Sequence, residues 1–313
     1  MNDDTLTNRH DFLLLFEVTN GNPNGDPDAG NMPRLDPNTN RGLVSDVCLK
    51  RKVRNFVEEF APHRVDEGSN GYNILIRQGA IIERAQNDGI KATKQVGKDR
   101  DQHAEDAMRW LCREFFDVRT FGGVLSTGDD VMKGSAFGQV RGPVQFTFGL
   151  SFHPITPLEI TITRCAVTKE SDKDKERTMG NKHIVPYALY AAKGYVSPAF
   201  AERTGFTQAD LDLLFEALLQ MFEHDRSAAR GEMIVRGLYD FEHVGTQHEN
   251  NAEQNRREAR LGCAHAHKLF EGINVRLQEG LDFPESFADY EVICAWDNQA
   301  LPKGVHLHKR HDE

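Results

Sequence analysis

Cysteine is scarce in this sequence and is not arranged as a metal site or a disulfide framework. The chain of 313 residues has five cysteines, and no two of them form a C-x-x-C pair. A zinc knuckle needs paired ligands and a small disulfide scaffold needs an even set of cysteines, so neither is indicated. We expect buried thiols in a reducing compartment for Cys48, Cys112, Cys165, Cys263 and Cys294.

Long apolar segments are also missing. No stretch approaches the roughly 20 apolar residues of a membrane-spanning helix. The first residues, Met1-Asn2-Asp3-Asp4, are acidic where a secretory signal would be basic and then apolar. Hydrophobic residues nevertheless make up 39% of the chain, which is enough to build a core. The sequence therefore predicts a folded protein of the cytoplasm.

Net positive charge is lacking as well. The chain has 38 Lys and Arg against 48 Asp and Glu, a formal charge of -10 at pH 7. Non-specific affinity for nucleic acid comes mainly from Lys and Arg, so a general nucleic-acid coat is not expected from charge alone. Any binding of nucleic acid has to depend on local basic patches.

Motifs of catalysis and of metal binding are missing too. Residues 22–28 carry Asn or Asp at every second position, as a calcium loop does, but the twelfth position holds Pro or Leu instead of Glu. Gly128 is followed by Asp129, which excludes a P-loop. His265 and His267 are two apart on an expected helix and should point in different directions. With no catalytic set either, we expect no metal, no cofactor and no enzyme activity.

What the chain does contain is a series of strand and helix patterns. Residues 11–18 are apolar on both alternating faces, which is typical of a central strand covered on both sides. Residues 43–60 carry one apolar stripe with a helical repeat. The other patterns predict strands at 73–82, 140–152, 158–166, 233–244 and 290–296, and helices at 103–116, 210–222 and 254–270. These elements favour an α+β fold around a mostly antiparallel sheet.

A long polar loop precedes the first helix. Residues 19–42 hold Gly, Pro, Asn or Asp at most positions, and the loop is longer than most ordered loops, which indicates a function. Two interpretations stay open. The loop is either an Ω-loop tied by its own prolines and asparagines, or a rigid loop that positions Arg34 over a ligand. Arg41, at its end, stands just before the helix.

The helix after this loop is predicted to have a basic face. At about 100° per residue, Lys50, Arg51 and Arg54 fall within an arc of roughly 100°, while Lys52 lies on the other side. Ser45 stands near the helix N-terminus, where free N–H groups and the helix dipole favour a phosphate. The face is either an edge that binds an RNA backbone or a solvated surface with Ser45 as the N-cap.

Three later segments are further candidates. Gly122 and Gly123 would let the backbone approach a phosphate closely, or would only form a turn. Arg141 opens an expected strand and would contact a phosphate or form a surface ion pair. Residues 168–182 form a charged projection, for which a solvated hairpin tip is the alternative.

One stretch is specific enough to indicate a family. Residues 22–34 (NPNGDPDAGNMPR) and 45–55 (SDVCLKRKVRN), with Asp36-Pro37 between them, resemble the signature of the backbone subunit of type I-C CRISPR complexes, a member of the RAMP superfamily. Similar segments follow at 119–126 (RTFGGVLS), 138–148 (GQVRGPVQFTF) and 178–190 (TMGNKHIVPYALY).

The resemblance implies a fold and a set of partners. Residues 1–313 would form a single RRM-like palm of ferredoxin-like topology, with a helical web inserted at 61–135 and a β-hairpin thumb projecting at 154–190. The subunit would polymerise along a CRISPR RNA without catalytic activity, so that base pairing alone reads the target DNA strand. Its other partners would be further copies of itself, the small, large and RNA-processing subunits of the Cascade complex, and the helicase-nuclease which that complex recruits.

The resemblance also implies where the RNA lies. Basic side chains and Ser45 would hold phosphates, and Met179 would be an apolar wedge between bases, unless it only packs. The residues expected at the RNA are Arg34, Arg41, Ser45, Lys50, Arg51, Arg54, Gly122, Gly123, Arg141, Met179, Lys182 and His183. The alternative function is a metal-dependent endoribonuclease of the RAMP type that uses loop carboxylates, among Asp26, Asp28 and Asp36. A metabolic enzyme is a third possibility, for which the sequence supplies no motif.

Overall fold

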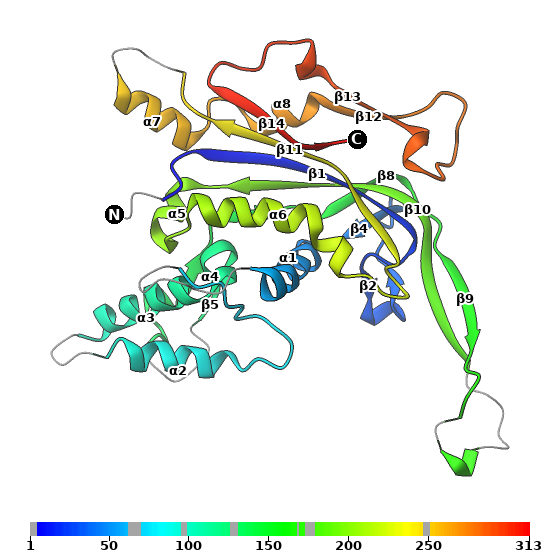
Figure 1. Ribbon diagram of the computed structural model, residues 1–313, viewed down its shortest axis with the longest axis horizontal. Coiled ribbons are helices and arrows are strands. Elements are labelled where there is room, and N and C mark those ends of the chain that lie inside the picture. Colours follow the sequence, from blue (N-terminus) through cyan, green and yellow to red (C-terminus); the bar gives the residue numbers. More distant parts are fainter. Residues whose placement is uncertain are drawn as a thin grey trace.

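An antiparallel sheet forms the centre of the molecule (Figure 1). The computed structural model describes residues 5–61, 70–94, 99–125, 131–167, 169–172, 179–246 and 251–313. Its eight-stranded sheet has the order β14-β11-β1-β10-β8-β4, and β7 and β9 pair with β10. The longest strands are β1 (Arg9–Gly21), β10 (Met179–Val196) and β11 (Glu232–His243).

Four strands and two helices follow the ferredoxin-like order. The chain runs through β1, α1, β8, β10, α6 and β11, and in the sheet these strands lie in the order β11-β1-β10-β8. That is the split β-α-β-β-α-β arrangement of RRM-like folds. The α+β fold with an RRM-like sheet is therefore confirmed. The bounds are α1 (Asp46–Phe60), β8 (Gly149–Pro154) and α6 (Gln208–His224), with β4 (Arg41–Val44) and β14 (Val305–Asp312) at the edges.

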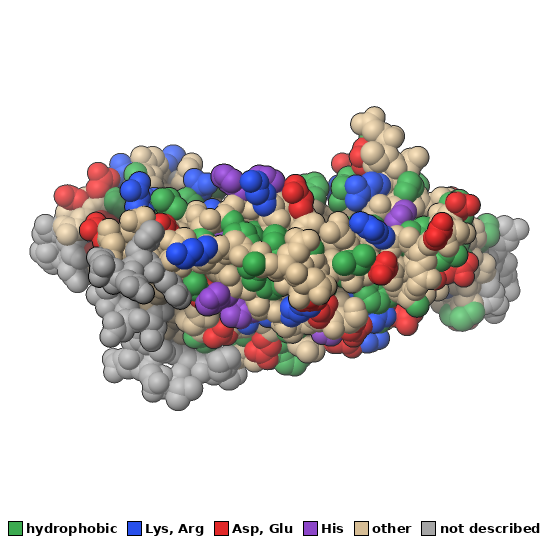
Figure 2. Space-filling view, turned by 90° about the horizontal axis from the view of Figure 1, so that it is seen from above, with side chains coloured by type: hydrophobic (Ala, Val, Ile, Leu, Met, Phe, Trp, Pro, Cys, Tyr) green, Lys and Arg blue, Asp and Glu red, His purple; other side chains and the backbone are tan. Residues whose placement is uncertain are grey.

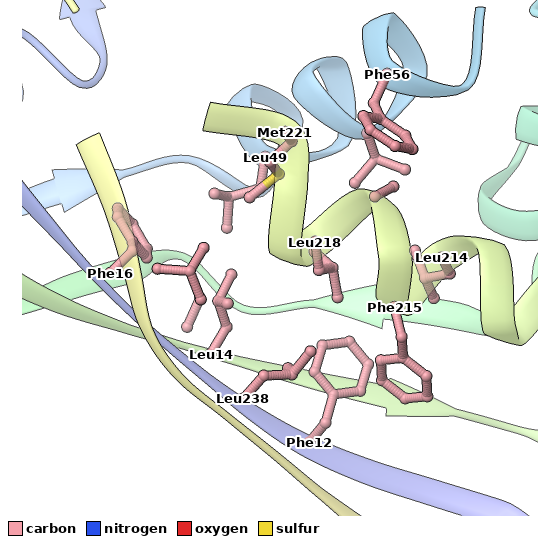
Figure 3. Close-up of a cluster of buried hydrophobic side chains, with 14 of the residues drawn as sticks. Phe12, Leu14, Phe16, Leu49, Phe56, Leu214, Phe215, Leu218, Met221 and Leu238 are labelled. Atoms are coloured by element: carbon pink, nitrogen blue, oxygen red, sulfur yellow. The ribbon is translucent and has the colours of Figure 1, made fainter. Parts of the chain in front are cut away.

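The main core lies between the sheet and the helices α1 and α6 (Figure 3). Phe12, Leu14 and Phe16 of β1 belong to this core, whereas Leu13 and Leu15 point to a second core on the opposite face. Strand β1 is thus covered on both sides, as the unbroken apolar run predicts. The two helices contribute Leu49, Phe56, Leu214, Phe215, Leu218 and Met221.

The second core is covered by C-terminal elements. It contains Tyr239 and Phe241 of β11 and Leu269 and Phe270 of the short helix α8. The helix expected at 254–270 is in fact two helices, because Gly262 adopts a φ of 104° and ends the first one. The elements are α7 (Ala252–Leu261), α8 (Ala266–Glu271), β12 (Ile273–Leu277) and β13 (Tyr290–Cys294).

A separate group of small elements is inserted between α1 and β8. It has a core of its own, which includes Ala107, Leu111 and Val118. The strand expected at 73–82 is wrong, because Asn73 forms only an isolated bridge and Ile82 begins a helix. The elements are α2 (Ile82–Ala92), α3 (Arg100–Glu114), α4 (Phe116–Phe121), β5 (Gly122–Val124), β6 (Gln139–Arg141) and β7 (Val144–Phe146).

A two-stranded ribbon projects from the sheet (Figure 1). Strand β9 (Leu158–Thr163) pairs with the first third of β10, from Leu158 opposite Ile184 to Thr163 opposite Met179. Every residue of β9 is exposed. We call this ribbon the thumb; residues 168 and 173–178 of the expected projection lie outside the described residues.

The structure also tests three other predictions. Of the five cysteines expected to be buried, Cys112 and Cys294 are buried, Cys48 and Cys263 are half-buried and Cys165 is exposed. The pattern at 140–152 is three strands and not one, since Gly142-Pro143 separates β6 from β7 and proline cannot donate to a ladder. Within the described residues, no helix is long and apolar enough to cross a membrane.

Candidate nucleic-acid interface

The polar loop before α1 folds back on the N-terminus of that helix. Strands β2 (Gly25–Asp26) and β3 (Met32–Pro33) pair as a small hairpin within it. The side-chain oxygen of Asn24 accepts two hydrogen bonds from Ser45, one from its backbone N–H and one from its hydroxyl, both at 2.9 Å. Asn22 donates to the carbonyl of Asn31 at 2.8 Å. The asparagines therefore tie the loop into a fixed shape.

An open cavity of about 520 Å³ lies between this loop, α1 and the end of α6. Its lining includes Arg34 from the loop, Arg51 and Lys52 from α1, and Arg230 from the turn before β11. Among the described residues that line it, Asp225 is the only carboxylate. We call the four basic residues the cationic cradle. Two neighbouring segments and one that follows almost 180 positions later thus bring positive charge to one place.

The cradle is only partly neutralised by the protein. Lys52 and Arg230 both pair with Asp225, the latter at 2.9 Å between Nε and Oδ2. Arg34 pairs with Asp26 at 3.3 Å through Nη1, but its buried Nε–H finds no hydrogen-bond partner in the described part of the chain. A buried donor needs an acceptor, and this N–H is available to a ligand in the cavity.

Ser45 is both an N-cap and part of the cavity wall. Its hydroxyl oxygen accepts the backbone N–H of Cys48 at 3.3 Å, which is the capping role. Burial raises the pKa of the Cys48 thiol, so this neighbour stays uncharged at neutral pH. Because Ser45 caps the N-terminus of α1 at the cavity wall, the positive end of the helix dipole adds to the positive charge of the cradle. Asp46 in the first turn offsets part of this charge.

The three cations predicted to share one face of α1 do not share it. Arg51 lies in the cradle beside Lys52, which was expected on the other side. Lys50 and Arg54 instead face Phe121 of α4, at 5.7 and 5.2 Å from the ring centroid. The prediction fails because the inserted elements pack against this side of α1, which a helical projection alone does not show.

Arg54 is the clearest correction. It is 8% exposed, and its Nε donates to the fully buried carboxylate of Asp117 at 2.8 Å. That carboxylate also accepts the backbone N–H groups of Leu75 and Ile76. The guanidinium of Arg54 is thus part of the protein interior. Lys50 keeps a partial exposure and pairs with Asp46 at 3.0 Å.

The glycine pair and Arg141 form a hairpin on the Phe121 side of α1. Gly122 has a φ of 76°, and a Cβ there would lie 2.2 Å from the carbonyl oxygen of Val140. It serves the close approach of β5 to β6. At Gly123 no described atom lies within 4 Å of an added Cβ. Arg141 lies across the ring of Phe200, with Cζ 4.4 Å from the centroid.

The other predicted residues lie at or on the thumb. Arg41 of β4 stands opposite Pro154 and donates its Nε–H to the carbonyl of Ser151. Burial lowers the pKa of Arg41. Met179 is 69% exposed at the first position of β10. Lys182 and His183 are half-buried on the same strand. The structure does not bring these residues into the cradle.

Sequence reasoning missed Lys52, Arg230 and Asn24 as members of the site. Arg230 follows α6 almost 180 positions after Lys52, so only the packing of α6 on α1 brings the two together. For Asn24 a signal existed in the composition of the loop. For Arg230 the sequence gives none.

The loop carboxylates are largely occupied within the protein. Asp26 accepts the N–H of Asp28 at 3.2 Å and pairs with Arg34. The hydroxyl of Thr39 and the N–H of Asn38 lower the pKa of Asp36. Over the described ranges, no three His, Cys, Asp or Glu side chains are grouped so that they could hold a metal ion.

The two histidines expected to diverge do not. The rings of His265 and His267 stack, with centroids 5.7 Å apart and planes 23° from parallel. His265 precedes α8 and is not part of it, so the helical projection does not apply.

On one face of the molecule, charges of both signs are mixed. Figure 2 shows the face that lies at the top of Figure 1, where blue and red side chains are interspersed. An RRM-like sheet with large insertions and a local basic cavity defines the class: an α+β protein related to RRM folds.

The family follows from comparison with known proteins. The model of the family "CRISPR-associated protein Cas7" matches residues 8–295. This chain therefore belongs to the CRISPR-associated protein Cas7 family, as the signature at 22–55 indicates.

Individual relatives are more distant. The chain is 28% identical over 228 residues to the CRISPR-associated protein Cas7 of Haloferax volcanii, covering 67% of this chain and 63% of that protein. It thus spans less than two thirds of that relative's length. A solved chain titled "CRISPR RNA-guided surveillance complex, pre-nicking" is 15% identical with a TM-score of 0.45, over 74% of this chain and 78% of that one. A chain of a type III-B Cmr-beta complex bound to cognate target RNA is 11% identical with a TM-score of 0.40, over 74% and 60%.

Proposed function

We propose that this chain is a non-catalytic backbone subunit of a type I-C CRISPR surveillance complex (Cascade). Several copies would assemble along the CRISPR RNA, hold its sugar-phosphate backbone and present the guide for pairing with the target DNA strand. The observation that carries the proposal is the cationic cradle. It brings Arg34, Arg51, Lys52 and Arg230 together on a chain whose net charge is strongly negative.

The chemistry of the cradle suits phosphate. Three of its four cations are arginines, whose planar guanidinium groups bind phosphate oxygens in pairs. Contacts of this kind carry no sequence information, which a subunit that accepts any guide requires. The Nε–H of Arg34, which no described residue accepts, offers a donor to a phosphate oxygen. Avidity from repeated copies would compensate for the small size of each site.

The proposed path continues across α1. Lys50 lies about 100° around this helix from Arg51, towards Phe121 and the β5–β6 hairpin with Gly123 and Arg141. Arg54 is left out of the proposed contacts because it is buried against Asp117. The absence of catalysis remains part of the proposal, and it is supported by the internal hydrogen bonds of Asp26 and Asp36.

The test is the salt dependence of RNA binding by an Arg34→Ala, Arg51→Ala double variant. Each phosphate contact with single-stranded RNA contributes about 0.7 to the slope of log K against log salt concentration. We expect weaker binding and a slope reduced by about 1.4 relative to the unmodified chain. Binding is measured by fluorescence anisotropy with guide-length RNA at four salt concentrations.

The matched control is Arg109→Ala, which removes an exposed arginine of α3 that pairs with Glu105 on the same helix. It should leave both affinity and slope close to the original values. If the double variant keeps its slope while its unfolding curve is unchanged, the RNA lies elsewhere and the cradle has another role.

A further inference from the structure

A pocket at the base of the thumb is lined by aromatic and proline side chains. It has a volume of about 210 Å³ and lies between β8, β10 and the segment that joins β12 to β13. Figure 1 shows this segment beside β8 and β10 where the thumb leaves the sheet. The walls include His153, Pro186, Tyr187, Phe283, Glu285 and Tyr290. No residue of the cationic cradle contributes to it.

Its walls are uncharged except at Glu285. The hydroxyl of Tyr187 donates to Glu17 at 2.9 Å, and that of Tyr290 lies 3.2 Å from Nδ1 of His153. Burial raises the pKa of both tyrosines, so both stay neutral. Burial, together with the nearby charge of Arg41, lowers the pKa of His153, which is therefore neutral at pH 7. The rings of His153 and Tyr290 lie 5.4 Å apart, and those of Tyr187 and Tyr290 lie 6.4 Å apart.

The segment that forms one wall of the pocket is acidic. Between Arg276 and Lys303 the sequence has six Asp and Glu and no Lys or Arg, and Glu285 among them lines the pocket. Phe283 is 81% exposed at the rim, next to the exposed carboxylate of Glu285. Carboxylates repel phosphate, which argues against a nucleic acid here. Aromatic faces and a carboxylate together attract a cation, above all one with an apolar stem.

The rim is held in a fixed shape before any partner arrives. The carboxylate of Asp289 accepts the backbone N–H groups of Glu285 and Ser286 at 2.7 and 2.9 Å, which lowers the pKa of Asp289. The backbone N–H of Gln278 donates to the carbonyl of Asp289 at 2.9 Å. A preorganised site loses less conformational entropy on binding.

We propose that this pocket receives an arginine or lysine side chain of a protein partner, and that an apolar neighbour of that side chain covers Phe283. The cation would lie against the rings of Tyr187 and Tyr290 with its charge towards Glu285. The site is separate from the RNA-binding cradle and does not depend on the proposed RNA function.

The experiment compares two isosteric probes on the intact chain. N-acetyl-L-argininamide and N-acetyl-L-citrullinamide differ in charge but hardly in shape, and their binding is measured by saturation-transfer NMR. We expect the arginine probe to bind about fivefold more tightly, which is the order of one cation-aromatic contact with a nearby carboxylate. Glu285→Gln should remove this preference, and Glu83→Gln on α2, exposed and distant, should keep it.

A second pair of probes tests the apolar neighbour. The peptide Gly-Ser-Leu-Arg-Leu-Ser-Gly should bind more tightly than Gly-Ser-Gly-Arg-Gly-Ser-Gly, and Phe283→Ser should abolish that difference. Equal binding of the arginine and citrulline probes would overturn the proposal. So would tighter binding of adenosine 5′-monophosphate than of N-acetyl-L-argininamide, because it would mark the pocket as a site for a nucleotide.

Discussion

At the scale of single residues, the adjacent glycines of β5 have different requirements. Gly122 has a left-handed φ and faces the backbone of β6, whereas Gly123 faces open space. A Cβ at Gly122 meets the carbonyl of Val140 and the N–H of Gly142, neither of which can move without breaking the hairpin. The first glycine is therefore structural, and only the second leaves its backbone open to a ligand.

We expect Gly122→Ala to lower the free energy of unfolding by about 2 kcal/mol, the usual cost of a strained φ together with a backbone overlap. Gly123→Ala should change it by less than about 0.5 kcal/mol. Urea denaturation followed by circular dichroism measures both. Equal losses in the two variants would show that the hairpin tolerates a shift, and that the distinction drawn from the positive φ is wrong.

Some arginines of the sequence are buried in ion pairs and therefore add no positive charge to the surface. Arg119 is fully buried, donates to both oxygens of Asp210 at 2.7 and 2.9 Å, and so connects α4 to the N-terminus of α6. Arg54 likewise connects α1 to α4 through its ion pair with Asp117. Both arginines lie within segments of the family signature. A signature residue therefore indicates importance, but only the fold separates structural cations from those that can contact RNA.

At the scale of elements, the C-terminal strand β14 is tied to β11 by buried charges. Asp240 of β11 lies 2.9 Å from Nδ1 of His10 and accepts from Arg310 of β14 at 2.8 Å. Burial on its own would raise the pKa of Asp240, but the hydrogen bond and charge of His10 and the guanidinium of Arg310 hold it below its usual value. The pKa of Glu242 is also lowered against the effect of burial, by Asn8 and His308.

These lowered pKa values make the attachment of β14 sensitive to acid. A carboxyl whose pKa is lower in the folded state stabilises the fold above its unfolded value, near 4, and this stabilisation is lost as the pH falls through the folded value. We therefore expect the amides of β14 to exchange faster relative to those of β1 below about pH 4. Hydrogen exchange with mass spectrometry at several pH values measures the ratio.

The control for this prediction is Asp240→Asn. The variant should be less stable at neutral pH, and its stability should depend less on pH between 6 and 3. A ratio of exchange that stays constant in the original chain would mean that β14 is held by its backbone pairing with β11 alone.

The elements also show what sequence patterns can and cannot provide. β1, α1 and α6 were predicted because their apolar residues repeat strongly, and burial in one or two cores enforces that repeat. β14 was missed because its stretch VHLHKRHD is mostly polar, and its place depends on charge pairs with a distant strand. Of the four residues of the cationic cradle, two were among the residues predicted from the sequence. Arg34 and Arg51 lie in a readable loop and helix, whereas Arg230 joins them only through packing.

At the scale of the whole molecule, the negative net charge is unevenly distributed. The segment between Arg276 and Lys303 carries six acidic residues and no basic one, while the cradle gathers four cations around one carboxylate. A chain with this distribution of charge would attract an RNA at one place and not over its whole surface. The uneven distribution also explains why the net charge alone argued against a nucleic-acid coat, although the chain belongs to the Cas7 family.

Assembly in several copies is the property that the whole molecule should show. If each copy covers a fixed length of RNA, the mass of the complex rises in steps of one chain as the RNA is lengthened, and the protein co-purifies with RNA when its guide is present. Sedimentation velocity with RNAs of increasing length measures the steps.

The thumb provides a variant that tests the contact between copies. Its residues Ile160 and Ile162 are 41% and 44% exposed and lie outside every core cluster of the described residues. We expect Ile160→Ser with Ile162→Ser to keep the folded stability and the affinity for a short RNA, but to reduce cooperative binding to a long one. Leu261→Ser, which removes an apolar side chain of α7 that is 62% exposed, should have no such effect. One copy per RNA at every length would contradict the backbone role, whereas stepwise assembly that the thumb variant leaves unchanged would place the contact between copies elsewhere on the chain.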